Sequence, residues 1–287
     1  MRIRRSIFYP VTLALLVLLA SGAYAKKECK AVYGESESEL SLATGSPGEL
    51  GLVKVLAEAF NKIHPVRLCW KKAGSGASLK LLKAKEADII LVHAPAAEKA
   101  AIKDGWAIKR SLIGSNEFYI VGPKSDPAGI KTAKSAKEAY AEINAAKAKF
   151  LSRGDNSGTH KKERHIWELA GIKPAGDWYI ETKAFMMATL KQADSDLAYF
   201  MTDSSTWAAT KKELSNLEVL YRGDPLLINT YHALCQPSGA TPSQKTAVRF
   251  IDFIVSEQGQ ALIHNYGMER YGASLYNDAS YAKQYDY

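Results

Sequence analysis

The sequence predicts an α/β protein with a mostly parallel sheet and two hydrophobic cores. Short apolar runs of strand character alternate with helical patterns along the chain, and this alternation is typical of right-handed βαβ units. The 287 residues are 47% apolar, which suffices for one large core or two smaller ones, and we expect two. Open parallel sheets bind ligands beyond the carboxyl ends of their strands, so a functional site is expected there.

The first 25 residues are expected to be a secretory signal that is cleaved near Ala25. Three arginines precede an apolar run over residues 7–20, and Ala23-Tyr24-Ala25 supplies an A-x-A cleavage site. The run is shorter than the roughly 20 residues that a membrane span needs. We therefore expect an exported, periplasmic protein.

The rest of the chain divides into strand and helix patterns. Strands are expected over residues 39–43, 66–70, 88–92, 149–151, 178–181 and 197–201, and extended runs over 118–123, 217–221 and 231–235. Helices are expected over residues 50–63, 77–84, 135–148, 160–170, 185–192, 243–255 and 257–264. The tail from Tyr266 is expected to pack on the surface without a function, and Asp194 and Asp196 to be solvated.

Charge and cysteine content exclude several classes of protein. Lys and Arg number 38 and Asp and Glu 30, but three of the arginines lie in the signal, so the remaining excess is too mild to favour nucleic acid. Cys29, Cys69 and Cys235 permit one disulfide and one thiol, whose pairing the sequence leaves open. Because no CxxC or CxxCH motif occurs, we expect no metal and no cofactor. Charged residues 26–28 disfavour lipid attachment at Cys29.

Two turns between a strand and a helix carry small polar residues. In the first, Ser46 is expected to be the N-cap, with Pro47 next and Glu49 completing a capping box; alternatively, Thr44, Gly45 and Ser46 present hydroxyls and amides to an anion. In the second, Ser75 lies between two glycines, as in a tight turn or a backbone that bends around a ligand. Neither turn matches a P-loop or a dinucleotide fingerprint.

A third turn, residues 152–163, is the strongest candidate for an anion site. It places Arg153, Ser157, Gly158 and Thr159 between a strand and a helix. The first N–H groups of a helix have no internal partner and lie at the positive end of its dipole. Arg153 adds a full charge and a fork of donors. Because the chain has three turns of this kind, we expect them to form a shared oxyanion pocket.

The chain resembles the periplasmic substrate-binding components of tungstate ABC importers, within the type II solute receptors. The most specific matches are Val92-His93-Ala94-Pro95 and the string over residues 152–160. Supporting matches extend through most of the mature chain, over residues 42–44, 87–91, 119–123, 126–130, 170–172, 176–182, 188–190, 202–203, 206–207 and 223–225.

This resemblance implies two α/β lobes, residues 26–120 with 229–287 and residues 121–228, which are joined by crossing strands and clamp an oxyanion between them. It implies a monomeric receptor, not an enzyme, that delivers its ion to a membrane permease. By position, the ligand contacts would be Thr44, Gly45, Ser46 and Ser75 from the first lobe and Arg153, Ser157, Gly158 and Thr159 from the second.

Two segments depart from the family pattern. Residues 43–46 replace a Thr-Thr-Thr-Ser loop and lose two hydroxyls, and residues 181–186 place Lys183 and Phe185 near a possible pocket wall. These departures concern the identity of the ligand more than the fold. An organic anion is the alternative that Lys183 and Phe185 would support.

The orientation of Asp155 distinguishes the candidate ions. Tungstate, molybdate and sulfate are unprotonated dianions that only accept hydrogen bonds, whereas hydrogen phosphate also carries a donor and rewards a carboxylate in the pocket. Asp155 inside the pocket would therefore mean phosphate. Asp155 turned aside and bracing Arg153 would fit tungstate, and we favour this second orientation because the other matched segments belong to the tungstate family.

A secreted serine hydrolase is the alternative from another class. Ser157 would be its nucleophile, with His93 or His160 as the base. The sequence has no G-x-S-x-G elbow, and Ser157 lies where a helix should begin. We expect His93 to form a hydrogen bond within its own lobe and His160 to lie in the first turn of a helix.

Overall fold

The protein is described by a computed structural model over residues 28–286, so the predicted signal lies outside the described residues. Within them, ten strands form one sheet in the order β1-β3-β2-β4-β10-β5-β8-β6-β7, with β9 also paired to β5. The strands are β1 (Ala31–Tyr33), β2 (Glu39–Thr44), β3 (Arg67–Lys72), β4 (Ile89–Val92), β5 (Ile108–Pro123), β6 (Phe150–Ser152), β7 (Tyr179–Glu181), β8 (Tyr199–Asp203), β9 (Leu217–Tyr221) and β10 (Ile228–Cys235).

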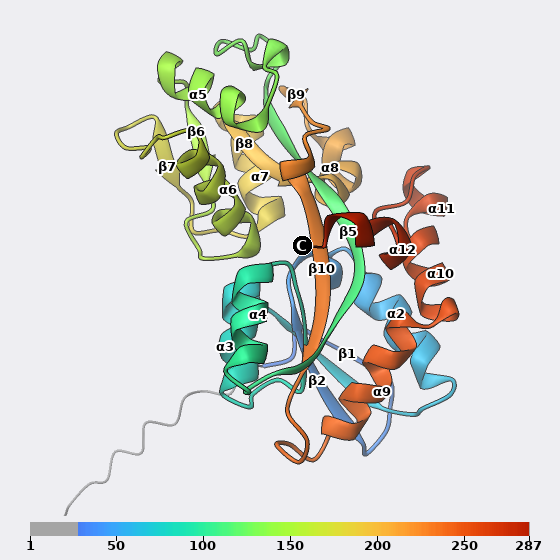
Figure 1. Cartoon of the computed structure of the whole chain (residues 1–287). Helices are drawn as coiled ribbons and strands as arrows, with labels where there is room; N and C mark the ends of the chain where they lie inside the picture. The colour runs from blue at the N-terminus through green and yellow to red at the C-terminus, as the bar shows by residue number, and fades with distance from the viewer. Residues whose placement is uncertain (1–27, 287) are drawn as a thin grey trace, which may run out of the picture.

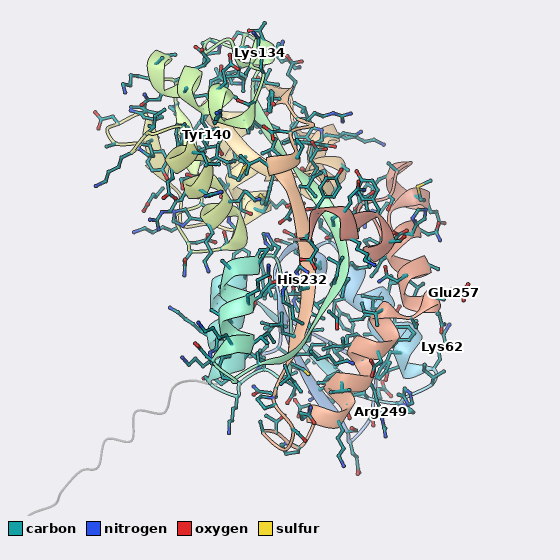
Figure 2. All side chains as sticks on the ribbon, viewed as in Figure 1. Lys62, Lys134, Tyr140, His232, Arg249 and Glu257 are labelled. Atoms are coloured by element: carbon teal, nitrogen blue, oxygen red, sulfur yellow. A yellow bond between two sulfur atoms is a disulfide. The ribbon has the colours of Figure 1, made fainter. Side chains whose placement is uncertain are left out.

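Helices cover this sheet in two separate lobes (Figure 1). One lobe has the buried cores that draw on residues 40–113 and 231–276, and the other has a core drawn from residues 118–227. Among the labelled side chains, Tyr140 lies in the second lobe and His232 in the first (Figure 2). The helices are α1 (Ser46–Glu49), α2 (Leu52–Asn61), α3 (Ser75–Lys83), α4 (Pro95–Lys103), α5 (Ala136–Ala146), α6 (Gly158–Leu169), α7 (Met186–Asp196), α8 (Ser204–Thr210), α9 (Gln244–Val255), α10 (Glu257–Asn265), α11 (Met268–Tyr271) and α12 (Ala279–Ala282).

Each lobe contains one set of three parallel strands, and the other strand pairs are antiparallel. Strand β2 pairs in parallel with β3 and β4, and β6 pairs in parallel with β7 and β8. The carboxyl ends of β2, β3 and β6 lead into the three polar turns. The predicted α/β architecture with two lobes is confirmed.

Two long antiparallel strands, β5 and β10, run side by side from one lobe to the other (Figure 1). The sequence prediction found only the ends of these strands, residues 118–123 and 231–235. The missed part of β5, residues 108–117, is largely half-buried and mixes charged, polar and apolar side chains. A strand with two partly exposed faces lacks the alternation on which sequence prediction depends.

The first polar turn differs from its prediction. The N-cap of α1 is Gly45, which makes no side-chain capping bond, and Ser46 is the first helical residue. Glu49 forms an ion pair with Lys72 at 2.6 Å and does not complete a capping box. The helix predicted over residues 50–63 is α2, which begins two residues later than predicted because Gly51, with a φ of 94°, separates it from α1.

Most of the carboxyl-terminal tail lies on the surface of the first lobe, as expected, but part of it enters the core. Leu275 and Tyr276 are buried in the first-lobe core. Near the chain end, Asp286 pairs with Arg110 at 2.9 Å, and its carboxylate lies 3.1 Å from Nε2 of His232. The tail thereby fastens to side chains of both crossing strands.

Asp194 is likewise buried, although it was expected to be solvated. Its carboxylate accepts hydrogen bonds from the backbone N–H groups of Asn216 at 2.8 Å and Leu217 at 3.0 Å. These bonds hold the start of β9. A carboxylate that accepts several backbone bonds tolerates burial because its hydration is replaced.

One disulfide forms, as predicted, and it joins Cys29 to Cys69. The remaining thiol, Cys235, is buried. The bond ties the segment before β1 to the middle of β3. None of the helices within residues 28–286 has the length and apolar character required to span a bilayer.

Candidate functional site

A small pocket lies between the lobes, where the polar turns meet. Its cavity volume is only about 10 Å³, which is room for roughly one water molecule. Six of the eight predicted ligand residues line it, and the other two belong to the start of α6 directly behind Ser157. The lining residues are Thr44, Gly45, Ser46, Pro47, Gly74, Ser75, Leu91, His93, Arg153, Ser157, Phe185 and Tyr231.

The hydroxyls of the first-lobe wall differ in what they can offer an anion. Thr44 Oγ1 donates its proton to the carbonyl oxygen of Leu91 at 2.8 Å, so its side chain has no proton left for a ligand. Ser75 Oγ accepts a bond from the backbone N–H of His93 at 3.1 Å, which leaves its proton available. The backbone amides at the starts of α1 and α3 add donors on this side.

The second-lobe wall is the start of α6. Ser157 is its N-cap, and its hydroxyl oxygen accepts the N–H of His160 at 3.2 Å, so its own proton is available. Gly158 and Thr159 follow in the first turn, where backbone N–H groups have no intrahelical acceptor. The dipole of this 12-residue helix adds positive potential at the same place.

Gly158 and Thr159 do not line the pocket with their side chains. A Cβ on Gly158 would lie 2.4 Å from the ring of His93, so this glycine permits close contact between the lobes. The hydroxyl of Thr159 is buried and has no hydrogen-bond partner among the described residues. Their predicted role as ligand contacts therefore depends on their backbone amides. For Thr159 it also depends on rotation of the side chain to direct its hydroxyl into the pocket.

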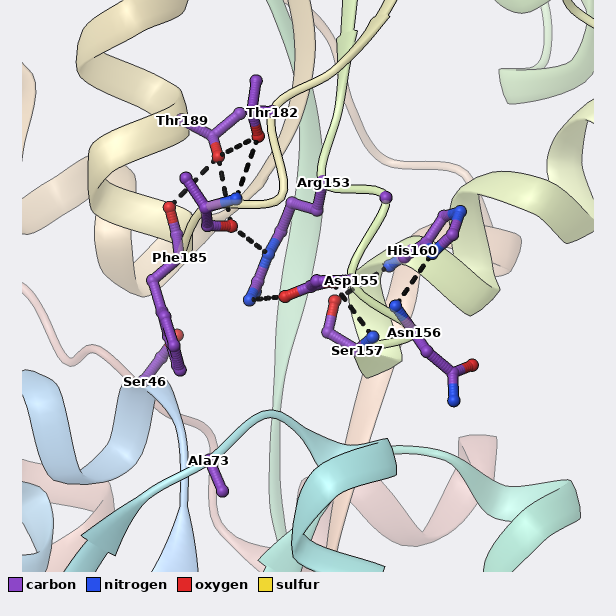
Figure 3. Close-up of polar contacts among 12 residues, drawn as sticks. Ser46, Ala73, Arg153, Asp155, Asn156, Ser157, His160, Thr182, Phe185 and Thr189 are labelled. Carbon is purple, nitrogen blue, oxygen red and sulfur yellow. Dashed lines mark hydrogen bonds and ion pairs between the residues drawn. The ribbon is translucent and has the colours of Figure 1, made fainter.

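Arg153 projects from the second lobe toward the first (Figure 3). The side chain is 4% exposed. Its Nε donates to the carbonyl of Ala184 at 3.2 Å, and its Nη2 forms an ion pair with Asp155. A guanidinium has five N–H donors, so these two contacts leave donors for a ligand.

Asp155 braces this arrangement and does not line the pocket. One carboxylate oxygen pairs with Arg153, and the other accepts the backbone N–H of Ser157 at 3.1 Å. Of the two orientations considered for Asp155, the structure shows the one that is turned aside.

His93 is tied to its own lobe, as predicted, but it also lines the pocket. Its Nδ1 lies 2.8 Å from Asn229 Oδ1. Asn229 in turn donates to Asn116 at 2.8 Å, and Asn116 donates to the carboxylate of Asp203 at 3.3 Å. This chain of bonds requires Asn229 Oδ1 to accept, so the proton of neutral His93 is on Nδ1. The Val-His-Ala-Pro string was the sequence signal for this residue.

Burial lowers the pKa of His93 from 6.5 to about 4. Between those pH values an unfolded chain binds a proton that the folded chain does not, so His93 reduces stability as the pH falls below 6.5. The loss amounts to about 2 kcal/mol at pH 5, from 1.36 kcal/mol per pKa unit.

We therefore expect His93→Gln to lose less stability than the natural chain between pH 7.5 and pH 5. Urea unfolding at both pH values measures the difference, with the exposed His165 changed to Gln as the control. An unchanged pH dependence in His93→Gln would show that His93 titrates normally in the folded state.

The contacts of Ser157 do not support a serine hydrolase. The Nδ1 of His160 accepts from the backbone of Asn156 at 3.0 Å, and the Nδ1 of His93 faces Asn229. Ser157 meets His160 through the backbone N–H alone. Within residues 28–286, no group of three or more His, Cys, Asp or Glu side chains could hold a metal ion.

Lys183 and Phe185, which depart from the family pattern, differ in their positions relative to the pocket. Lys183 is exposed and has a φ of 52°, and it does not line the pocket. Phe185 does line it. Pro47 and Tyr231, which also line the pocket, carried no functional signal in the sequence, because an apolar or aromatic wall residue has the same pattern as a core residue.

Comparisons with known proteins agree with this geometry. Residues 31–258 match the PBP superfamily domain. The chain is 34% identical to the tungstate-binding protein TupA of Peptoclostridium acidaminophilum, over 91% of this chain and 94% of that protein. It is 33% identical to the TupA of Campylobacter jejuni, over 74% and 81% of the two chains.

A solved structure shows the same relationship in three dimensions. The tungstate ABC transporter structure from Geobacter sulfurreducens superposes with a TM-score of 0.73 at 36% identity, and covers 81% of this chain and 100% of that one. Both the fold and the sequence thus assign the chain to a class of transporter receptors, not to an enzyme class. The chain belongs to the PBP superfamily, and within it to the family of tungstate-binding proteins of ABC transporters.

Proposed function

We propose that this protein is a high-affinity receptor for a tetrahedral oxyanion, with tungstate as the preferred ion, and that it delivers this ion to an ABC importer. Its relatives are named for tungstate binding. The pocket offers a dianion the protons of Ser75 and Ser157, the guanidinium of Arg153 and amides at helix starts. Such donors can replace the hydration of the ion without a counter-charge for each oxygen.

The orientation of Asp155 is the observation that carries this proposal. A carboxylate that faced an unprotonated dianion would repel it. Here both carboxylate oxygens are engaged, one with Arg153 and one with the backbone of Ser157. The acid therefore orients the arginine and leaves the pocket to donors, as tungstate, molybdate and sulfate require.

Phosphate is the second candidate, and one observation favours it. With its proton on Nδ1, His93 presents Nε2 as a bare acceptor on a residue that lines the pocket. Hydrogen phosphate could donate its proton there. Sulfate has no such proton and would gain nothing from His93.

Titration calorimetry with sodium tungstate, molybdate, sulfate and phosphate separates these candidates. We expect strong one-to-one binding of tungstate, weaker or similar binding of molybdate, and much weaker binding of the other two. Strong phosphate binding without tungstate binding would overturn the choice of ion, and its loss in His93→Gln would then identify His93 as the acceptor. Hydrolysis of an ester substrate would contradict a receptor altogether.

We further propose that the protein acts in the periplasm as a monomer, without a cofactor and without nucleic acid. Closure of the two lobes around the ion would create the surface that the permease recognises, since both lobes contribute to the pocket. Size-exclusion chromatography with light scattering tests the monomer, and reconstituted uptake with the cognate permease tests delivery.

A further inference from the structure

The ring of Phe185 connects the two lobes at the edge of the pocket. Phe185 immediately precedes α7 in the second lobe, whereas Lys72 ends β3 in the first. The Nζ of Lys72 lies 4.3 Å from the centre of the ring. The Cζ of Arg153 lies 5.4 Å from the same centre, so one ring contacts a cation from each lobe.

Each cation is held by a carboxylate of its own lobe. Lys72 pairs with Glu49 at 2.6 Å, and Arg153 pairs with Asp155. The side chains of Lys72 and Glu49 are 26% and 19% exposed. Because water is partly excluded, the attraction between ammonium and ring is stronger than on an open surface.

The segment that carries Phe185 is fixed by hydrogen bonds (Figure 3). Thr189 Oγ1 donates to the carbonyl of Phe185 at 3.1 Å. The carbonyl of Ala184 accepts from Arg153 Nε, and Thr182 Oγ1 donates to the carbonyl of Ser152 at 3.2 Å. The ring is therefore positioned by the same loop that positions Arg153.

We propose that the contact between the Lys72 ammonium and the Phe185 ring, called the clasp below, forms when the lobes close. This contact slows release of the bound oxyanion. The contact joins two lobes that move apart on opening, so it stabilises the closed state relative to the open one. Phe185 also shields the pocket from water, which strengthens the charge-assisted bonds of Arg153. The effect on release rests on the proposed oxyanion function, whereas the effect on closure does not.

Dissociation rates test the clasp directly. We expect Phe185→Ala and Lys72→Met each to release tungstate about tenfold faster than the natural chain in a stopped-flow displacement experiment, as for loss of a partly desolvated cation–π contact. The double variant should be no faster than the faster single variant, since both remove one contact. Phe185→Leu, which keeps apolar cover but loses the ring, should fall between the natural chain and Phe185→Ala.

The matched control is Lys83→Met, because Lys83 lies 5.4 Å from the ring of Trp106 within the first lobe. Its loss should leave the dissociation rate unchanged. Rates within twofold of the natural chain for Lys72→Met and Phe185→Ala would overturn the clasp. Additive effects in the double variant would show that the two residues act separately, and would overturn it as well.

A measurement without ligand separates the clasp from the proposed function. Spin labels at Lys103→Cys and Lys173→Cys, two exposed positions in opposite lobes, report the distance between the lobes by pulsed electron resonance. Phe185→Ala should shift the distribution of the ligand-free protein toward longer distances, whichever ion it binds. Failure of tungstate to bind the natural chain would count against the proposed function, and an unshifted distribution would count against the clasp.

Discussion

Arg153→Ala should weaken tungstate binding by at least about 300-fold. The variant loses charge-assisted hydrogen bonds, which contribute roughly 1.5–3 kcal/mol, and leaves the carboxylate of Asp155 without its cation beside the anion. Truncation of one partner in a buried charge pair costs about 2–5 kcal/mol, largely because the other charge is left uncompensated. Both effects act in the same direction, and titration calorimetry with sodium tungstate measures their sum.

Two further variants identify the source of the loss. In Arg153→Ala with Asp155→Ala the repulsion is absent, so part of the affinity should return. Arg164→Ala removes an exposed arginine from α6, the helix that follows Arg153, and should change affinity less than twofold at physiological salt. Full affinity in Arg153→Ala would show that the guanidinium does not reach the ion.

Gly158→Ala should weaken tungstate binding roughly 5- to 100-fold while the lobes remain folded. The added methyl would lie 2.4–2.7 Å from three atoms of the His93 ring, which its bond to Asn229 prevents from moving freely. Overpacking of this kind costs about 1–3 kcal/mol. Because His93 and Gly158 belong to different lobes, opening relieves the clash, so the cost falls on closure. Calorimetry gives the affinity, and small-angle scattering with saturating tungstate gives the degree of compaction.

Two other glycines provide the comparison. Gly76→Ala places a methyl 2.4 Å from the backbone oxygen of Asn156, again across the lobes, and should behave like Gly158→Ala. Gly48→Ala places its methyl 2.1 Å from the ring of Trp70 within one lobe, so it should lower the melting temperature instead. Natural affinity and natural compaction in Gly158→Ala would show that the closed lobes do not meet at this residue.

Local patterns explain why much of the site could be predicted from the sequence. Each polar turn follows a strand of a parallel pair, and the carboxyl ends of such strands meet at one edge of a sheet. Ser75 in the first lobe and Arg153 and Ser157 in the second therefore each lie at such an edge, and the two edges face each other across the pocket. The helix that begins at Gly158 was predicted within two residues, because its N-cap chemistry is local.

Features that depend on distant partners were not predictable. The proton of Thr44 is used by the carbonyl of Leu91, 47 residues away, and no local pattern indicates that acceptor. Asp286 is held by Arg110, 176 residues earlier, so the tail has the pattern of a surface segment in the sequence. The long strand β5 lacks clear alternation because its first five residues are half-buried on both faces.

The paired crossing strands also determine how this molecule can deform. A two-stranded ribbon tolerates a wide range of twist, so rotation of one lobe about β5 and β10 need not break a bond of their ladder. The register of the ladder shifts between Tyr231 and His232, and such an irregularity is where torsion concentrates. The ribbon therefore acts as a flexible hinge, and the side-chain contacts between the lobes provide the resistance to opening. Substitutions at single positions between the lobes can therefore change the stability of the closed state relative to the open state while the backbone stays the same.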